Sequence, residues 1–386
     1  MQQLTVVGGG FAGLVAAIDA AEAGARVTVY EAHRELGGRA RTASGPYRTN
    51  EGPHALYRGG PHWAWLAERD LIGPLARVPL AETLRLRLHQ DGRLRRTPPV
   101  PLLRLARRPV TDAPVDRTFL SWAAPLVGER GARQAANFLA VALFHHDVGA
   151  LSAAFVQERL VRVAAFPPEA SYPRGGWQSV VDRMAARARA LGVRIETGAR
   201  LTGLPGDGPV VVATSLAAAR TLLGDASLTW ESGRTVLLDL ALDARRGDPW
   251  VLSDLDAPAW LERFTGQDPG LAPAGHSLVQ GQLPIGPGQS KAEGIARAER
   301  LLDLGFRGWR ERVLWRREAL ASGRTGAVDL PGTTWRDRPA VDRGHGVYLA
   351  GDQVAAPGVL SEVSFNSARE AVTLAVRGGR PLHTTA

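Results

Sequence analysis

A glycine-rich turn near the N-terminus constrains the fold of this chain more than any other feature. Residues 4–7 form a short apolar run of β-formers that leads into GGGFAG at positions 8–13, which has the pattern G-x-G-x-x-G. Apolar residues then recur at helical spacing as far as Gly24, and residues 26–30 form a second apolar run. A strand, a glycine turn, a helix and a second strand in this order predict an α/β dinucleotide-binding fold built on a parallel sheet.

The glycines of this turn and the start of the helix have distinct roles. Gly8 permits the tight turn, Gly10 lets the backbone approach a pyrophosphate, and Gly13 permits close contact between the helix and the strand. The backbone N–H groups at the helix start, where Phe11 and Ala12 lie, favour phosphate groups through hydrogen bonds and the helix dipole. We therefore expect these five residues to bind the cofactor.

The residues after the second run separate FAD from NAD as the ligand. Glu31 follows the glycines by about twenty residues, where a carboxylate can accept hydrogen bonds from a ribose. Ala32 comes next, and the chain then reaches Gly37-Gly38-Arg39. This succession resembles the FAD-binding superfamily of flavin amine oxidases, protoporphyrinogen oxidases and phytoene-desaturase-like enzymes. The resemblance implies that these residues lie along an FAD, with Arg39 near the pyrophosphate, whose oxygens a guanidinium fork can bind.

Residues 47–56 carry the same resemblance. It implies that the backbone of Gly52, Pro53 and His54 runs near the flavin ring. We name His54 as the candidate catalytic residue, although a lone histidine is more often structural than catalytic.

Residues 172–214 resemble the phytoene-desaturase-like branch, beginning at a Y-P-x-G-G stretch. The resemblance implies that this stretch completes the nucleotide domain and that Leu201 meets the adenine end. The elements expected are a helix at 178–191, strands near 192–198 and 200–204, and a buried strand at 209–214.

The C-terminal region resembles the closing motif of the superfamily. Residues 346–350 form an apolar strand that stops at Gly351 and Asp352, and a helix begins over 359–364 and runs to about residue 376. The resemblance implies that Asp352 binds the ribityl or pyrophosphate region. It also implies that the turn next to the flavin ring is formed by Val359, Leu360 and Ser361. The dipole of the helix that follows favours negative charge on the ring.

The remaining pattern predicts a second, mixed domain. Residues 118–160 are helical in pattern, residues 292–303 form an amphipathic helix, and strands are expected at 235–242, 277–283 and 309–315. The chain is therefore expected to fold as an α/β protein with a two-dinucleotide-binding, Rossmann-like FAD domain and an interleaved α+β substrate domain. The FAD domain is assigned to residues 1–78, 170–230 and 331–386, and the substrate domain to residues 79–169 and 231–330.

Composition excludes several functions. The absence of cysteine excludes disulfides, thiolate metal sites, cysteine nucleophiles and thiol-linked flavin, so FAD would be held non-covalently. No basic segment precedes the first apolar run and no eighteen apolar residues are consecutive, so we expect no signal peptide or membrane span, and a cytoplasmic protein. The net charge of +9 is spread over the chain without a nucleic-acid-binding motif, so no nucleic acid partner is expected. His145-His146-Asp147 has no accompanying ligand cluster, so no metal is expected.

One basic segment stands apart from this even distribution. Residues 84–88 and 94–97 are expected to form a β-hairpin around Asp91-Gly92. Arginines are dense from residue 85 to residue 108, and leucines lie between them. Such a segment is either a solvated hairpin edge or a site of peripheral contact with anionic lipid, and the sequence leaves both interpretations open.

The resemblance implies a two-electron dehydrogenation of a small organic substrate, with hydride transfer to flavin N5. We find no second strand–glycine–helix unit for a nicotinamide: Gly286-Pro287-Gly288 lacks the third glycine of the G-x-G-x-x-G pattern, because Lys291 occupies that position. Oxygen or a quinone is therefore the expected electron acceptor. Lys291 is also the only lysine, and it enters a helix from a glycine- and proline-rich loop, which disfavours a lysine-dependent amine oxidase. The alternatives are an FAD-assisted isomerase or dehydroxylase without net redox change, and a non-catalytic FAD-binding module at a membrane. The pattern makes no prediction of oligomeric state.

Overall fold

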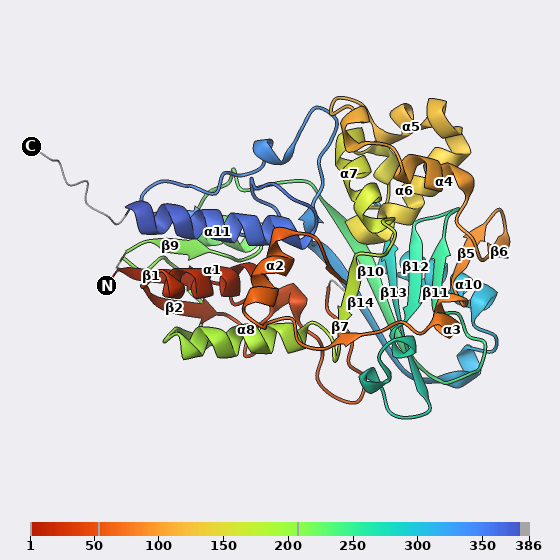
Figure 1. Cartoon of the computed structure of the whole chain (residues 1–386), viewed down its shortest axis with the longest axis horizontal. Helices are drawn as coiled ribbons and strands as arrows, with labels where there is room; N and C mark the ends of the chain where they lie inside the picture. Colours follow the sequence, from red (N-terminus) through yellow and green to blue (C-terminus); the bar gives the residue numbers. More distant parts are fainter. Residues whose placement is uncertain (1, 53–54, 207, 379–386) are drawn as a thin grey trace, which may run out of the picture.

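The computed structural model describes residues 2–52, 55–206 and 208–378, which form two sheets and the helices around them (Figure 1). The first sheet has the strand order β15-β9-β1-β2-β8, and every neighbouring pair in it is parallel. Its strands are β1 (Gln3–Val7), β2 (Arg26–Glu31), β8 (Arg194–Thr197), β9 (Val210–Val212) and β15 (Val347–Leu349). The predicted parallel α/β fold is confirmed.

Helices bury this parallel sheet. α1 (Phe11–Glu22) packs against both α8 (Gln178–Ala190) and α11 (Ser361–Gly378). α9 (Leu216–Leu223) contributes Leu216 and Ala219 to the same hydrophobic core. The strands are short and valine-rich because a parallel sheet that is covered by helices presents apolar side chains on both faces.

The second sheet is larger and mixed. Its strand order is β14-β10-β13-β12-β11-β5-β6, and all its pairs are antiparallel except β11 with β5. The strands are β5 (Arg87–Gln90), β6 (Arg93–Arg95), β10 (Ser232–Asp243), β11 (Val251–Asp254), β12 (Ala259–Arg263), β13 (His276–Pro284) and β14 (Val313–Ala327). α10 (Lys291–Gly305) covers one face through an apolar cluster with β10 and β13.

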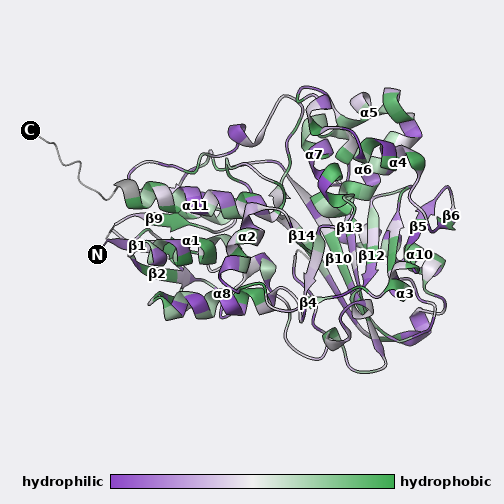
Figure 2. Ribbon diagram, viewed as in Figure 1, coloured by the Kyte–Doolittle hydropathy of each residue, from purple (hydrophilic) through white to green (hydrophobic). Residues whose placement is uncertain are grey.

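A helical layer lies beside the second sheet (Figure 1). It is formed by α4 (Val100–Ala106), α5 (Phe119–Val127), α6 (Glu129–Leu143) and α7 (Ala153–Val163), which share one hydrophobic cluster. Figure 2 shows hydrophobic residues along these helices and along the strands of both sheets. Between the two sheets run α2 (Pro61–Glu68) and a ribbon of β3 (Leu56–Tyr57), β7 (Ala170–Pro173) and β4 (Leu75–Ala76). The short helix α3 (Leu80–Thr83) lies at the far end of the second sheet (Figure 1).

The two sheets are interleaved along the chain, because the parallel sheet takes its strands from three separate stretches. The three hydrophobic clusters follow the same division, one under the parallel sheet, one among α4–α7 and one between the second sheet and α10. The exact residue bounds given above for an FAD domain and a substrate domain stay a prediction.

Four sequence-based boundaries are wrong in detail. Residues 309–315 are not one strand: Arg310–Arg312 is a 3-10 turn, and β14 continues from Val313 to Ala327 because it pairs with the long strand β10. Residues 200–204 form no strand, and β8 is left as the edge of its sheet. The hairpin arms are Arg87–Gln90 and Arg93–Arg95, and α11 begins only at Ser361.

Candidate cofactor site

The glycine turn between β1 and α1 is closely packed at two of its positions. Gly8 has a φ of 108°, and a Cβ atom there would lie 2.5 Å from the carbonyl oxygen of Ala213. A Cβ atom at Gly13 would lie 1.9 Å from the carbonyl oxygen of Gly8. A side chain at either position would therefore push the helix away from the sheet, as the sequence pattern predicts.

Three other glycines each leave room for a Cβ atom at ordinary van der Waals distance. A Cβ atom at Gly10 would meet nothing closer than the Gly37 carbonyl oxygen at 3.8 Å, and those at Gly38 and Gly351 would have nearest neighbours at 3.6 Å and 3.8 Å. Gly10 is also the N-cap of α1 and supplies no side-chain cap. The N–H groups of the first helical turn have no intrahelical acceptor, so this open cradle fits a pyrophosphate group.

Glu31 is held at the carboxyl end of β2. Its side chain is buried, and its two oxygens accept hydrogen bonds from the backbone N–H groups of Gly9 at 2.7 Å and His33 at 2.8 Å. The backbone N–H of Ala199 donates to the Glu31 carbonyl, which brings the segment leading to Leu201 beside this strand end. Each carboxylate oxygen has a second lone pair, so the group can still accept a ribose hydroxyl. Ala32 follows directly.

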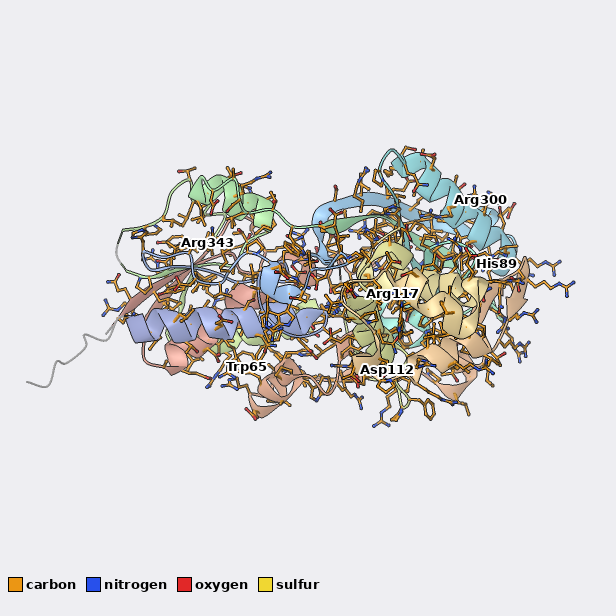
Figure 3. The ribbon with its side chains drawn as sticks, turned by 90° about the horizontal axis from the view of Figure 1, so that it is seen from above. Trp65, His89, Asp112, Arg117, Arg300 and Arg343 are labelled. Atoms are coloured by element: carbon orange, nitrogen blue, oxygen red, sulfur yellow. The ribbon has the colours of Figure 1, made fainter. Side chains whose placement is uncertain are left out.

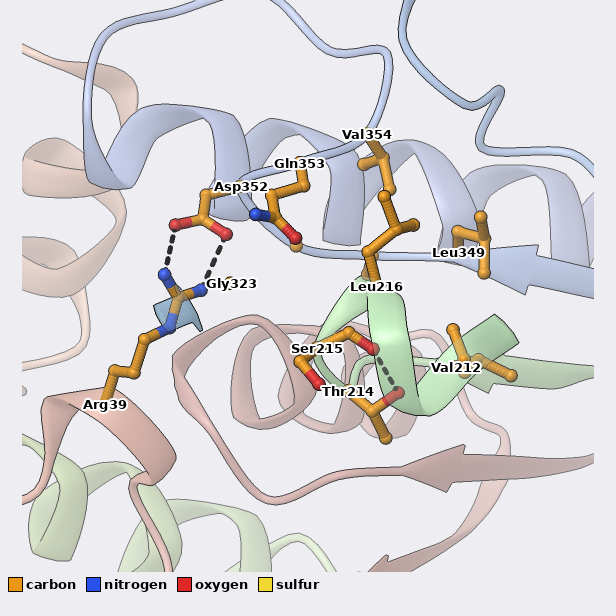
Figure 4. A pocket seen from close by; sticks show the side chains of 13 residues that line it. Arg39, Val212, Thr214, Ser215, Leu216, Gly323, Leu349, Asp352, Gln353 and Val354 are labelled. Carbon is orange, nitrogen blue, oxygen red and sulfur yellow. Dashed lines mark hydrogen bonds and ion pairs between the residues drawn. The ribbon is translucent and has the colours of Figure 1, made fainter. Parts of the chain in front are cut away.

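Arg39 and Asp352 meet although 313 positions separate them (Figure 4). The two guanidinium NH groups donate to the two carboxylate oxygens at 2.6 Å each. Burial lowers the pKa of Arg39, but the charge and hydrogen bonds of Asp352 outweigh this effect and raise the pKa overall. Gly351 is held by Ser367, whose hydroxyl accepts from its N–H at 2.9 Å. A Cβ atom at Gly52 would lie 2.7 Å from the Arg39 carbonyl oxygen, so Gly52 packs directly on this residue.

A pocket opens at this edge of the parallel sheet (Figure 4). It is lined by Arg39, Val212, Thr214, Ser215, Leu216, Ala219, Gly323, Leu349, Ala350, Gly351, Asp352, Gln353 and Val354. Sequence reasoning missed Thr214 and Ser215, although they directly follow β9, which neighbours β1 on the side opposite β2. In open α/β sheets ligands bind where the strand order reverses, beyond the carboxyl ends of the strands. Gly323 comes from β14, so the second sheet also reaches the pocket.

The predicted turn next to the flavin ring lies at the start of α11. Val359 is buried, Leu360 has an unusual φ of 56°, and the Ser361 hydroxyl lies 3.4 Å from Nε2 of His62. Burial lowers the pKa of His62 to about 4, so this imidazole is neutral at pH 7. None of the three turn residues lines the pocket described above. Pro53 and His54 lie outside the described residues, and a catalytic role for His54 stays a prediction.

The face of the second sheet opposite α10 carries a row of polar side chains. Arg317, Asp239, Gln280 and Glu262 lie in register on the neighbouring strands β14, β10, β13 and β12. Arg317 Nε donates to Asp239 at 2.8 Å, and Gln280 Nε2 donates to Asp239 at 2.8 Å. Burial raises the pKa of Asp239, against the opposing effect of Arg317. Burial also raises the pKa of Glu262 to about 7, although Gln267 donates to it at 2.9 Å.

This polar row contacts the segment that precedes Gly52. Arg317 NH1 donates to the Glu51 carboxylate at 2.7 Å, and Gln280 exchanges hydrogen bonds with the backbone N–H and carbonyl of Asn50 at 3.3 Å and 3.4 Å. Because Gly52 packs on Arg39, the row is continuous with the cofactor pocket. Sequence reasoning missed these residues, because they come from four strands whose pairing register the sequence alone does not reveal.

Lys291 and a cluster of one histidine with two aspartates lie away from the pocket and the polar row. Lys291 starts α10, and its Nζ lies 3.1 Å from Glu318, which is the next residue after Arg317 on β14 and so points to the opposite face of the sheet. His89, Asp254 and Asp256 bring potential ligand atoms within 4.8 Å of one another, a grouping that sequence reasoning missed because His89 is far from the two aspartates in the chain. Among the described residues no helix is long and apolar enough to cross a membrane.

Comparison with known proteins supports the assignment of the first sheet. Residues 6–70 match the family described as an NAD(P)-binding Rossmann-like domain. No curated protein sequence matches the chain. An oxidoreductase from Methanosarcina mazei superposes with a TM-score of 0.75 at 20% identity, over 96% of this chain and all of that one.

Two enzymes of different reaction type are also similar in structure. Cyclohexylamine oxidase from Brevibacterium oxydans IH-35A gives a TM-score of 0.70 at 17% identity, over 98% of this chain and 100% of that chain. Reduced UDP-galactopyranose mutase gives 0.71 at 13% identity, over 99% of this chain and 97% of that chain. The chain shares their fold. The sequence-based resemblance to the flavin amine oxidase group is thus confirmed at the level of architecture.

Proposed function

We propose that this protein is an FAD-dependent oxidoreductase that dehydrogenates a small organic substrate. The observation that carries the proposal is the meeting of Arg39 and Asp352 beside the open cradle of Gly10, Gly38 and Gly351. A Rossmann turn alone would bind any dinucleotide, whereas a half-buried arginine and an acid brought from the far end of the chain suit a longer ligand with a pyrophosphate and a polyol.

Each residue of the site would hold one part of FAD. The N–H groups at the start of α1 and the Arg39 guanidinium would bind the pyrophosphate, and Glu31 would accept hydrogen bonds from the adenosine ribose. Asp352 would bind ribityl hydroxyls, and the segment at Leu201 would contact the adenine. No cysteine is present to form a thiol link, so binding would be non-covalent.

The substrate would be bound against the polar face of the second sheet. FAD, when bound, supplies the two-electron acceptor, and the protein supplies binding, orientation and exclusion of water. Glu262 is the buried group on that face with a pKa raised to about 7, which is where a proton acceptor or donor is effective at neutral pH. Arg317 pairs with both Asp239 and Glu51, and these three residues would present hydrogen-bonding groups to the substrate.

Identification of the bound cofactor is the first test. Purified protein is expected to be yellow and to release intact FAD on acid or heat denaturation; release of NAD or NADP alone, identified by mass spectrometry, would refute the proposal. Anaerobic addition of candidate substrates should then bleach the flavin band, and oxygen or a quinone should restore it. NADH and NADPH at millimolar concentration should not bleach the flavin at a useful rate.

A non-redox reaction is the second candidate, and the similarity to UDP-galactopyranose mutase favours it. In that case FAD would assist an isomerisation or dehydroxylation without net transfer of electrons to an acceptor. Product mass separates the isomerase from the dehydrogenase, because dehydrogenation removes two hydrogens and isomerisation removes none. A protein that holds FAD and whose flavin band responds to no substrate would instead be a binding module. We further propose a cytoplasmic location.

A further inference from the structure

Exposed apolar side chains gather in one stretch of this chain. Seven of the twelve large hydrophobic residues that are exposed in the described part of the chain lie between positions 80 and 115. They are Leu80, Leu84, Leu94, Val100, Leu103, Val110 and Val115. Leu80 is 77% exposed and Leu84 is 67% exposed. Exposed apolar side chains that gather in one region mark an interaction site, whereas single scattered ones are normal on a protein surface.

Most arginines of the same stretch have no acidic partner among the described residues. Its arginines are Arg77, Arg85, Arg87, Arg93, Arg95, Arg96, Arg104, Arg107 and Arg108. Among the described residues only Arg85 and Arg108 have acidic partners, Glu82 at 2.9 Å and Asp112 at 3.5 Å. The other acid inside residues 77–108, Asp91, pairs with Arg130 from outside the stretch. The pKa of Arg87 is lowered by burial and then by repulsion from Arg96 and Arg85, so these guanidinium groups lie close together.

These residues lie together at one end of the molecule. α3, the hairpin β5–β6 and α4 lie at the far end of the second sheet from the parallel sheet (Figure 1). Seen from above, His89 of the hairpin and Arg343 of the parallel-sheet region mark opposite ends (Figure 3). All three residues of β6 are exposed, and β6 is the edge strand of its sheet. We call residues 77–115 the arginine–leucine surface.

We propose that the arginine–leucine surface docks the protein on an anionic lipid bilayer. Arginines would bind lipid phosphates, and the exposed leucines and valines would enter the boundary between headgroups and acyl chains. The helices there are only four and seven residues long, so insertion is shallow and nothing spans the bilayer. Nucleic acid fits less well, because residues 77–115 contain no Phe, Tyr or Trp on which bases could stack, and the His89 ring is held by Asp254. This inference does not depend on the proposed function.

Co-sedimentation of the full-length protein with vesicles tests the proposal. The protein is expected to bind vesicles of phosphatidylglycerol and phosphatidylcholine in a ratio of about one to three at about 0.1 M salt, and to bind pure phosphatidylcholine poorly. Absence of binding to the anionic vesicles would overturn the proposal. Tighter binding to single-stranded DNA than to these vesicles would also overturn it and would favour a nucleic acid partner.

Two matched triple variants distinguish binding through the arginine–leucine surface from a general effect of the net charge of the protein. Replacing Arg93, Arg95 and Arg96 with glutamine should weaken vesicle binding about a hundredfold, since each arginine near an anionic surface contributes about fivefold. The control replaces the exposed Arg26, Arg189 and Arg220, which have no acidic partner in the described part of the chain, and should lose far less affinity. An equal loss in both triple variants would refute a specific surface.

The leucines give an independent readout. Leu80→Ser with Leu84→Ser should weaken binding at low and at high salt alike, because apolar insertion is not screened by ions. Unchanged binding in this variant would show that the leucines do not enter the bilayer and would contradict the proposed mode of docking. Circular dichroism melting of every variant distinguishes lost binding from lost folding.

Discussion

The two sheets of this protein use their surfaces differently. The parallel sheet is apolar on both faces, and the groups that it offers to a ligand lie beyond its strand ends, on turns and the start of α1. The second sheet packs a large apolar cluster against α10, whereas its other face carries Arg317, Asp239, Gln280 and Glu262 in one row beside a smaller apolar cluster. This difference suits the two sheets to different ligands. Backbone groups at the first sheet suit a ligand that many proteins share, whereas side chains of the second sheet can select a particular substrate.

The largest effect that would test this division is expected at Gly10. Gly10→Val should fold, because a Cβ atom there would meet nothing closer than 3.8 Å, but its side chain would fill the cradle and reduce FAD occupancy to less than about a tenth of the wild-type value. Gly206→Val is the matched control: a Cβ atom there meets no described atom within 4 Å, and the position precedes β9 rather than following a strand end. Full FAD content in folded Gly10→Val, measured by absorbance per mole of protein, would show that the ligand is held elsewhere.

Arg39 tests the side-chain contribution to the first site. Arg39→Met should raise the dissociation constant for FAD about ten- to a hundredfold, since a charge-assisted contact to phosphate is worth about 1.5–3 kcal/mol. Arg343→Met removes an arginine that pairs with Asp225 at 2.5 Å outside the pocket and should leave the constant nearly unchanged. Titration of apoprotein with FAD, followed by fluorescence quenching, distinguishes these outcomes. Equal affinities in the two variants would remove Arg39 from the site.

A substitution at Glu262 tests how much burial of polar groups on the polar face of the second sheet lowers the free energy of unfolding. The pKa of Glu262 is raised from 4.5 to about 7 in the folded protein, so the folded state binds this proton more tightly. The resulting stability is fully present below pH 4.5 and is lost as pH rises to about 7, by about 3 kcal/mol at most. Glu262→Gln should therefore show a flatter dependence of unfolding free energy on pH between pH 5 and 8.

Urea denaturation at several pH values measures this slope. The control is Glu231→Gln, at an exposed position just before β10, and it should keep the wild-type slope. If the unfolding free energy of Glu262→Gln depends on pH as steeply as that of the wild type, the Glu262 carboxylate is ionised throughout this pH range. Its burial would then reduce stability less than we expect.

The smallest effect is expected at Lys291, on the apolar side of the second sheet. Its pair with Glu318 is partly exposed and contributes at most about 1 kcal/mol to stability. Lys291→Met should leave reoxidation of the reduced flavin by oxygen nearly unchanged, as measured by stopped-flow absorbance. A fall of about a hundredfold in this reoxidation rate, typical of losing a positioned catalytic group, would indicate that the reaction takes place at the α10 face of the second sheet.

The first sheet was far more predictable than the second. Its turn, helix and strands depend on neighbours in sequence, so the glycines at positions 8–13 and the acid at 31 could be assigned from spacing alone. Asp352 was found only through the resemblance of its strand and glycine. Nothing in the sequence showed that it pairs with Arg39, because that contact depends on the order of the parallel strands.

The second sheet depends on register, which a single sequence does not determine. Asp239, Gln280 and Arg317 lie side by side only because three strands pair with particular offsets. A shift of one residue in any strand would send its side chain to the α10 face. β14 was predicted too short for the same reason: its length is set by pairing with β10 and not by its own pattern.

The place of β15 affects how a newly made chain can fold. β15 pairs with β9, but the ribosome releases it only after the whole second sheet has been synthesised. Until then β9 is an unpaired edge of valines that can attach to another nascent chain. Productive folding therefore depends on protecting that edge during translation, and slowed synthesis of the central region should increase aggregation without altering the finished protein.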